Sequence, residues 1–174
     1  MFLGFVVFAA IVAGALWFVA TYNYLTLTKQ RVARAWSNLD VPVRERHDEL
    51  PRLVEICGKY LRGEQVALDR VLAARGAIFA ARHSFDPKVL GPAEIELRRE
   101  LGNLLGLAQG ERELLANQQF SSLQQRLGEL GQQIAERRRA YNDAVNENNI
   151  AIDQFPGRIV AGIGGFRRFE PLDF

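Results

Sequence analysis

The sequence predicts an all-α protein in which a single N-terminal transmembrane helix is followed by an antiparallel, up-and-down four-helix bundle. Three observations predict this fold class. The first 28 residues carry no charged side chain. After position 25, apolar residues recur at the three- and four-residue spacings of helices. Glycine and proline are too sparse for the many turns of an all-β chain.

The predicted anchor is the N-terminal apolar run, Phe2–Ala20. At about 1.5 Å per residue, a helix of this length crosses roughly the 30 Å hydrocarbon core of a bilayer. Trp17 and Tyr22 lie at its C-terminal end, where interfacial aromatic residues are expected. We therefore assign residues 1–22 to a transmembrane anchor.

Two other interpretations of the run are open. Ala13-Gly14-Ala15 resembles a cleavage site, so the run could be a signal peptide of a secreted helical bundle. However, no basic residue precedes the run, and it is long for a signal peptide. The second alternative is a buried helix of a soluble domain.

The charges that flank the run predict its orientation. Lys29, Arg31 and Arg34 follow it, and only the α-amino group precedes it. The positive-inside rule then predicts a single-pass protein of the cell inner (cytoplasmic) membrane, with the N-terminus outside and the bundle in the cytoplasm. Cys57, the single cysteine, fits a reducing compartment and excludes a disulfide framework.

The bundle is predicted to occupy residues 23–156. Its last helix covers Asn117–Gln154 and is ended by Pro156-Gly157. A second helix covers Glu94–Ala108, preceded by a loop over His83–Gly91. The apolar residues of the last helix repeat as an a/d seam through about five heptads. They are Phe120, Leu123, Leu127, Leu130, Ile134, Tyr141, Val145, Ile152 and Phe155.

The region 25–82 keeps one helical phase throughout, yet a single helix of this length would be about 85 Å long, so a reversal is expected. One candidate is the turn at Gly63, with Pro42 and Pro51 then accommodated inside the first helix. The other is Asp48 as an N-cap. We prefer Gly63. The seam residues are Val32, Leu39, Val43, Leu50, Val54, Cys57, Leu61, Leu68, Val71 and Ile78.

The chain resembles the LemA family of bacterial membrane-anchored proteins along nearly its whole length. The residues that carry the resemblance are Tyr22-Asn23, Arg31-Val32, Ala35-Trp36-Ser37, Leu39-Asp40-Val41, Arg46-His47-Asp48, Leu50-Pro51, Leu53-Val54-Glu55, Gly58-Lys59-Tyr60, Ala74-Arg75, Arg138-Arg139, Tyr141-Asn142-Asp143, Val145, Phe155-Pro156, Val160-Ala161-Gly162 and Gly165-Phe166. Asn148-Asn149 departs from the family, which has a second Tyr-Asn pair there. The resemblance implies one membrane helix, a cytoplasmic four-helix bundle and no established activity.

Catalytic chemistry has few candidates in this sequence. His47 and His83 are the only histidines, and neither belongs to a metal-binding pattern. No P-loop, dinucleotide fingerprint or nucleophile elbow is present. The net charge of +2 does not indicate nucleic acid. We expect no enzyme activity, no catalytic or metal-binding residues, no cofactor and no nucleic-acid partner.

Polar residues in phase with the seams favour a structural role. Arg75, Arg137 and Asn148 are examples, and such residues fix the register of packed helices. The alternative is an enzyme or ligand-binding protein with a cryptic polar site between the helices. That site would be built from Glu64, Arg75, Arg137 and Tyr141.

The C-terminal tail, residues 157–174, combines apolar residues with arginines. In an up-and-down bundle the last helix returns to the start of the first, so the tail should emerge beside the bilayer. Its composition suits an interfacial segment on an anionic membrane. The alternative is that it packs back on the bundle.

These observations predict a non-catalytic, membrane-anchored scaffold or adaptor, or an accessory subunit of a membrane assembly. Its predicted partners are membrane lipids and a protein of unknown identity, with self-association as one form of that contact.

Overall fold

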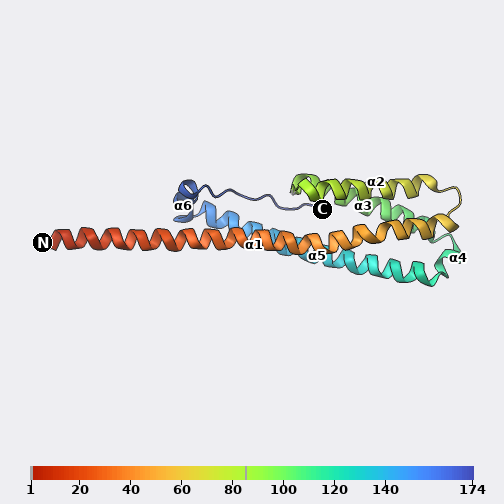
Figure 1. Cartoon of the computed structure of the whole chain (residues 1–174), viewed down its shortest axis with the longest axis horizontal. Coiled ribbons are helices and arrows are strands. Elements are labelled where there is room, and N and C mark those ends of the chain that lie inside the picture. The colour runs from red at the N-terminus through yellow and green to blue at the C-terminus, as the bar shows by residue number, and fades with distance from the viewer. Residues whose placement is uncertain (1, 85) are drawn as a thin grey trace. The chain divides into compact units, whose positions relative to one another are not determined.

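The computed structural model describes residues 2–84 and 86–174, so Met1 and Phe85 lie outside the described residues. These described residues form six helices and no strand. The helices are α1 (Phe2–Tyr60), α2 (Gln65–Ser84), α3 (Pro87–Ala108), α4 (Arg112–Leu115), α5 (Gln118–Asp153) and α6 (Gly157–Gly164) (Figure 1). The all-α class is confirmed. The described helices outnumber the predicted four, and α4 and α6 are the short ones.

The chain divides into two compact units. Unit 1 comprises the chain up to Trp36 together with Ala140–Pro171, and unit 2 comprises Ser37–Arg139 together with Leu172–Phe174. Helices α1 and α5 each contribute residues to both units.

Helix α1 is continuous over 59 residues, with Pro42 and Pro51 inside it. It ends at Tyr60, and the chain reverses through Gly63, whose φ of +100° is accessible to glycine but strained for other residues. The reversal predicted at Gly63 is confirmed. The alternative at Asp48 is wrong, because Asp48 lies within α1.

The core of unit 2 is built from the predicted seams. Leu39 and Leu50 of α1 are buried as predicted, Leu53 is buried although it was not predicted, and α2 and α3 pack against each other. Of the predicted seam residues in this part of α1 and α2, Val54 alone is half-buried rather than buried. The other predicted seam residues that are buried in unit 2 are Val43, Cys57, Leu61, Leu68, Val71, Ile78, Phe120, Leu123, Leu127, Leu130 and Ile134, and Leu97, Leu104 and Ala108 of α3 are buried with them.

Helix α3 begins earlier than the sequence predicted. The predicted loop His83–Gly91 is wrong over most of its length, because α2 continues to Ser84 and α3 begins at Pro87. Asp86 caps α3: its side chain accepts a hydrogen bond from the backbone N–H of Lys88 at 2.9 Å. Proline at the first helical position adds a preformed φ and needs no hydrogen-bond acceptor.

Helix α5 matches the predicted Asn117–Gln154 to within one residue at each end. Asn117 sits just before it and accepts hydrogen bonds from the backbone N–H groups of Gln119 and Phe120 at 2.9 and 3.1 Å. In unit 1, α5 runs antiparallel to α1. The contacts that show this are Trp36 with Tyr141, at 5.4 Å between ring centroids, and Thr28 with Asn148.

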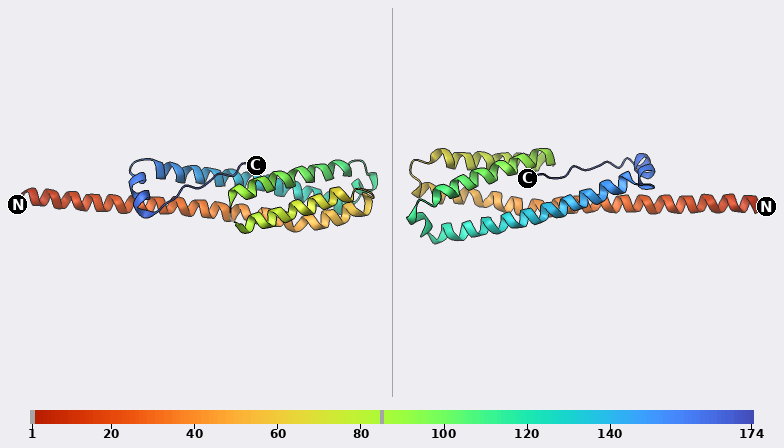
Figure 2. Two further views of the ribbon diagram at one scale, coloured as in Figure 1. Left: turned by 90° about the horizontal axis from the view of Figure 1, so that it is seen from above. Right: turned by 180° about the vertical axis from the view of Figure 1, so that it is seen from behind.

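Helix α6 was not predicted, because Pro156-Gly157 was interpreted only as a stop signal. The chain instead starts a new helix at Gly157 and ends it at Gly164, and the residue that follows, Gly165, has a φ of +68°. Val160 and Ala161 are buried against Leu25 of α1. Figures 1 and 2 show α6 lying beside α1. One face of the tail therefore packs back on the helices.

Gly157 is required at this corner, since a Cβ built there would lie 1.8 Å from the backbone carbonyl oxygen of Ala151. We expect Gly157→Ala to displace α6 from Leu25 while leaving unit 2 folded. Amide hydrogen exchange should then show faster exchange at Val160 and Ala161. Gly162→Ala is the matched control, because its Cβ meets no atom within 4 Å. Unchanged exchange in Gly157→Ala would contradict the packing described here.

Candidate functional site

The apolar run at the start of α1 is exposed along almost its whole length. None of its most apolar 18-residue stretch is buried, and α1 is long and apolar enough to cross a membrane by length and composition. Phe2, Phe8 and Ile11 are among its exposed side chains. A core helix of a soluble domain would bury such residues, and a contiguous apolar surface of this size marks an interaction site.

An aromatic cluster stands at the C-terminal end of this run. We name it the aromatic collar; its residues are Trp17, Phe18, Tyr22, Phe155 and Phe166. The ring centroids of Trp17 and Phe155 are 5.6 Å apart, and those of Tyr22 and Phe166 are 5.2 Å apart in an edge-to-face arrangement. Phe18 stacks on Tyr22 at 6.5 Å. The collar therefore joins α1 to the corner between α5 and α6.

The outer surface of α6 is apolar and bordered by basic residues. Ile159 and Ile163 are 53% and 70% exposed and lie one helical turn apart, on the side away from Gly157 and Ala161. Phe155, four residues before Ile159, is 76% exposed and lies beyond the end of α5, so its predicted position on the buried seam is wrong. The basic residues around this surface are Arg158, Arg167 and Arg168, all exposed, of which Arg168 pairs with Asp153 at 2.9 Å.

A shallow hollow lies beside the collar within unit 1. It has a volume of about 310 Å³ and is lined by residues of α1 and of the corner between α5 and α6. Its lining residues are Ala20, Thr21, Tyr24, Ala151, Gln154, Phe155, Pro156 and Gly157. Thr21 donates its hydroxyl to the carbonyl of Trp17 at 2.9 Å.

Side-chain amides hold the extended tail that follows α6. Asn149 accepts from the backbone N–H of Phe169 at 3.0 Å and donates to its carbonyl at 2.9 Å. The Tyr141 hydroxyl donates to the carbonyl of Glu170 at 3.0 Å. Burial, with a smaller effect of the Glu170 charge, raises the pKa of Tyr141 to about 12. Asn148, the predicted seam residue, is buried and pairs with Thr28.

Unit 2 contains a buried polar layer between its helices. Arg46 of α1 donates to both carboxylate oxygens of Glu94 of α3 at 2.5 Å, and both side chains are almost wholly buried. Arg82 donates to Asp40 at 2.6 and 2.8 Å, which raises the pKa of Arg82 above its usual value. Each charge has an opposite partner, so the layer fixes the register of α1 against α2 and α3.

The predicted cryptic site is not assembled as expected. Glu64 is exposed in the turn after α1, and Arg75 donates to the backbone carbonyl of His47 at 2.9 Å. Arg137 is exposed, so its predicted seam position is wrong. Tyr141 bonds to the tail.

Arg138 takes the inner position instead of Arg137. The seam of α5 steps from Ile134 by four residues and then by three to Tyr141, which turns Arg138 toward the core. Its guanidinium lies 5.1 Å from the ring centroid of Phe174, within the reach of a cation–π contact.

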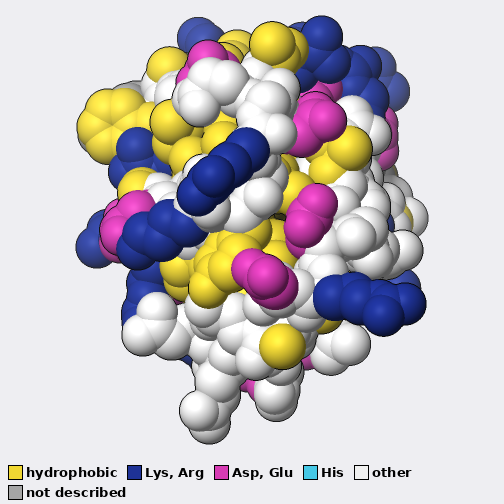
Figure 3. All heavy atoms as spheres, turned by 90° about the vertical axis from the view of Figure 1, so that its right-hand side faces the viewer, with side chains coloured by type: hydrophobic (Ala, Val, Ile, Leu, Met, Phe, Trp, Pro, Cys, Tyr) yellow, Lys and Arg dark blue, Asp and Glu magenta, His cyan; other side chains and the backbone are white. Residues whose placement is uncertain are grey.

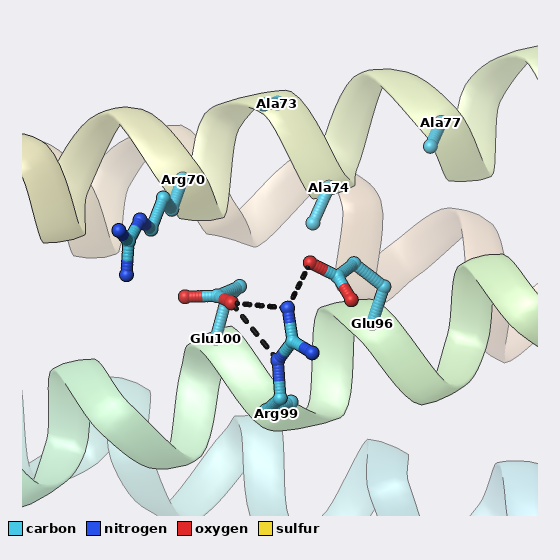
Figure 4. Close-up of a pocket in the computed structure, with 7 residues that line it drawn as sticks. All are labelled: Arg70, Ala73, Ala74, Ala77, Glu96, Arg99 and Glu100. Carbon is cyan, nitrogen blue, oxygen red and sulfur yellow. Dashed lines mark hydrogen bonds and ion pairs between the residues drawn. The ribbon is translucent and has the colours of Figure 1, made fainter.

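A hollow between α2 and α3 is the second candidate site. It has a volume of about 520 Å³, and Figure 4 shows the residues that line it. Arg99 pairs with Glu96 at 2.6 Å and with Glu100 at 3.0 Å, while small alanine side chains of α2 leave the space above them. Arg99, Glu96 and Glu100 pair with one another, Arg70 of α2 also lines the hollow, and the lining includes no serine, threonine, cysteine, lysine or histidine.

Charges of both signs are interspersed on the face of unit 2 shown in Figure 3. Figure 3 looks at this end of the chain, where basic, acidic and apolar side chains lie next to one another. Within residues 2–84 and 86–174, no group of three His, Cys, Asp or Glu side chains is placed to hold a metal ion.

Cys57 is buried on the seam of α1, and this burial raises its pKa to about 11. We expect the thiol to be unreactive toward an aromatic disulfide reagent at pH 8 and to react only on unfolding. The pKa of the thiol is near 9 in the unfolded chain and higher in the folded chain. Its contribution to the stability of the folded chain is therefore complete at pH values below 9 and is lost as the pH rises from 9 toward 11. Rapid reaction of the folded chain at pH 8 would contradict the burial.

The LemA family model matches residues 35–174. The match therefore begins near Trp36, where the first segment of unit 1 ends, and continues to the C-terminus. No curated protein matches the sequence.

Proposed function

The chain belongs to the LemA family, and from this premise we propose that it is a single-pass membrane protein that serves as a non-catalytic scaffold or adaptor, or as an accessory subunit of a membrane assembly. The observation that carries this proposal is the exposed apolar run of α1, which continues without interruption into a helical domain. An exposed helix of this length is most stable inside a bilayer.

The orientation that we propose for the membrane helix is inferred from the charged residues that flank it. Lys29, Arg31 and Arg34 follow the run and favour the cytoplasmic side of the inner membrane, with the N-terminus outside. The helical domain, in which α1, α2, α3 and α5 provide the four long helices of a bundle, then lies in the cytoplasm.

The pairing of the charged groups between the helices favours a binding role over catalysis. Arg46 and Glu94 neutralise each other in the interior, and Arg99 is paired with two carboxylates. An enzyme with a cryptic site would need an unpaired nucleophile, acid or base in an open cavity, whereas the carboxylates that line the α2–α3 hollow, Glu96 and Glu100, are paired with Arg99. The long exposed sides of α2 and α5 instead suit contact with a protein partner or with a second copy of the chain.

The test is chemical cross-linking in intact membranes, followed by purification of the full chain in a mild detergent. A second copy or one companion protein, recovered at fixed stoichiometry, is the expected result. A chain that stays monomeric and uncross-linked at native expression would contradict the scaffold role. The intact mass of the mature chain separates the secreted alternative, because cleavage removes about 20 residues.

A further inference from the structure

We propose that the outer face of α6, together with the aromatic collar, lies in the headgroup layer of an anionic bilayer and forms a second membrane contact beside the α1 anchor. This inference rests on the proposed membrane insertion of α1. The ligand is the lipid surface itself: acyl chains for the exposed apolar side chains and anionic headgroups for the arginines.

Helix α6 packs on α1 a short distance beyond the end of the apolar run. The apolar run ends at Ala20, and α6 packs on Leu25, five residues further along. At about 1.5 Å per residue this is roughly 7 Å beyond the end of the run. The headgroup region on each side of the hydrocarbon core is of similar thickness, about 5–8 Å. Packing within unit 1 therefore holds α6 at the level of the lipid headgroups.

The division of α6 into two faces is the second step. Val160 and Ala161 bury the inner face against α1, so the helix is fixed in place without using its outer side chains. Ile159 and Ile163 remain more than half exposed on the other side. Phe155, just before α6, is exposed as well and contacts Trp17 of the collar. Water would be an unfavourable neighbour for these three large, exposed apolar side chains, whereas the interface accommodates them.

Charge complementarity is the third step. Arg158 lies within α6, and Arg167 follows the helix; both are exposed. Basic residues that flank an apolar helix face bind anionic headgroups, and each strengthens binding by roughly fivefold. A neutral bilayer would satisfy the apolar face alone. The same surface covered by a second copy of the chain would leave these arginines without acidic partners from α6 itself, which contains no Asp or Glu.

The tail holds α6 in this position. Asn149 binds both backbone groups of Phe169, and Tyr22 packs edge-to-face on Phe166, so the segment after α6 is tied to α5 and α1. These contacts lie within unit 1 and do not depend on the lipid. The lipid-facing surface is thus preformed.

The experiment uses the full chain with Cys57→Ala. It is reconstituted in anionic vesicles, which contain neutral and anionic lipids at 3:1, and in vesicles of neutral lipid alone. An environment-sensitive fluorophore is attached to one introduced cysteine, and quenching is measured with lipids brominated near the headgroup. The labelled variants are Ile163→Cys, Phe8→Cys as the anchor reference, and Gln132→Cys as the exposed reference on α5. We expect at least twofold quenching for Ile163→Cys and none for Gln132→Cys.

The outcomes separate the two proposals. If Phe8→Cys is shielded from water while Ile163→Cys behaves like Gln132→Cys, the α6 contact is wrong and the anchor stands. If Phe8→Cys is also exposed, the anchor fails and the α6 contact with it. A blue-shifted but unquenched label at Ile163→Cys means that protein covers α6, which also overturns the proposal.

The arginines are tested in the same assay. Arg158→Gln with Arg167→Gln should lower vesicle-dependent quenching at Ile163→Cys by severalfold on anionic vesicles and have little effect on neutral ones. Equal quenching on both vesicle types before the substitutions would overturn the anionic assignment. Gln125→Ala with Gln132→Ala, two exposed changes on α5, is the matched control and should leave the signal unchanged.

Discussion

Arg46→Ala is expected to lower the free energy of unfolding by about 3–5 kcal/mol, since it leaves the Glu94 carboxylate buried without its partner. The side chain of Arg46 is 6% exposed and that of Glu94 is 0% exposed, so water cannot replace the lost bonds. Urea unfolding of the full chain in detergent, followed by circular dichroism, measures the loss.

The matched control is Arg126→Ala. Arg126 also pairs across two helices of unit 2, with Glu45, but both side chains are more than 40% exposed. Exposed pairs of this kind contribute about 0–1 kcal/mol. A loss of similar size in Arg46→Ala and Arg126→Ala would show that the buried pair is hydrated.

Replacing both partners tests whether the instability of Arg46→Ala comes from leaving one buried charge unpaired. Arg46→Met with Glu94→Leu fills the same space with apolar groups, and such replacements are neutral or stabilising by about 1–4 kcal/mol. We therefore expect the double variant to recover the stability lost in Arg46→Ala. A double variant as unstable as the single one would mean that the pair's other contacts, rather than its charges, hold α1 against α3.

The helical seams were predictable because burial follows a fixed period. Leu39, Leu50 and Ile78 were predicted from spacing alone and are buried. The reversal at Gly63 was predictable for a local reason, since a positive φ favours glycine. These features depend on short stretches of sequence, so no distant contact was needed to find them.

Other features depended on competing local signals. Asp86-Pro87 is an N-cap followed by a first-turn proline, yet the later Pro92 offered the same signal and the helix start was placed too late. The inner arginine of α5 was assigned to Arg137 because steps of three and four alternate, and one wrong step shifts the seam by one residue. Arg138 is the side chain that reaches Phe174.

The aromatic collar could not be derived from spacing. Trp17 and Phe155 are far apart in the sequence, and their contact exists only because α5 returns along α1 and the chain turns sharply at Gly157. The buried pair of Arg46 and Glu94 is similar: each residue was surface-like by type, and only the packing of α1 against α3 brings them together. The sequence contained a partial signal for both features. Trp17 lay at the predicted membrane interface, and Arg46 lay near the predicted seam residues Val43 and Leu50.

Ile11→Arg with Val12→Arg is expected to abolish membrane insertion. Each arginine near the centre of a transmembrane helix disfavours insertion by about 2.5–3.5 kcal/mol, and the two together by about 5–7 kcal/mol. That exceeds what a few neighbouring apolar residues can offset, at about 0.3–0.6 kcal/mol each. Extraction of membranes at alkaline pH, followed by immunoblotting of pellet and supernatant, measures the result: the native chain should stay in the pellet and the variant should leave it.

Two controls make this result specific to the run Phe2–Ala20. Val41→Arg with Val66→Arg introduces the same charge at exposed apolar positions outside the run, and it should stay in the pellet. Ile11→Leu with Val12→Leu changes the same positions without charge and should do likewise. If the arginine variant remains in the pellet while its intact mass shows an unprocessed chain, the run is not what holds the protein in the membrane.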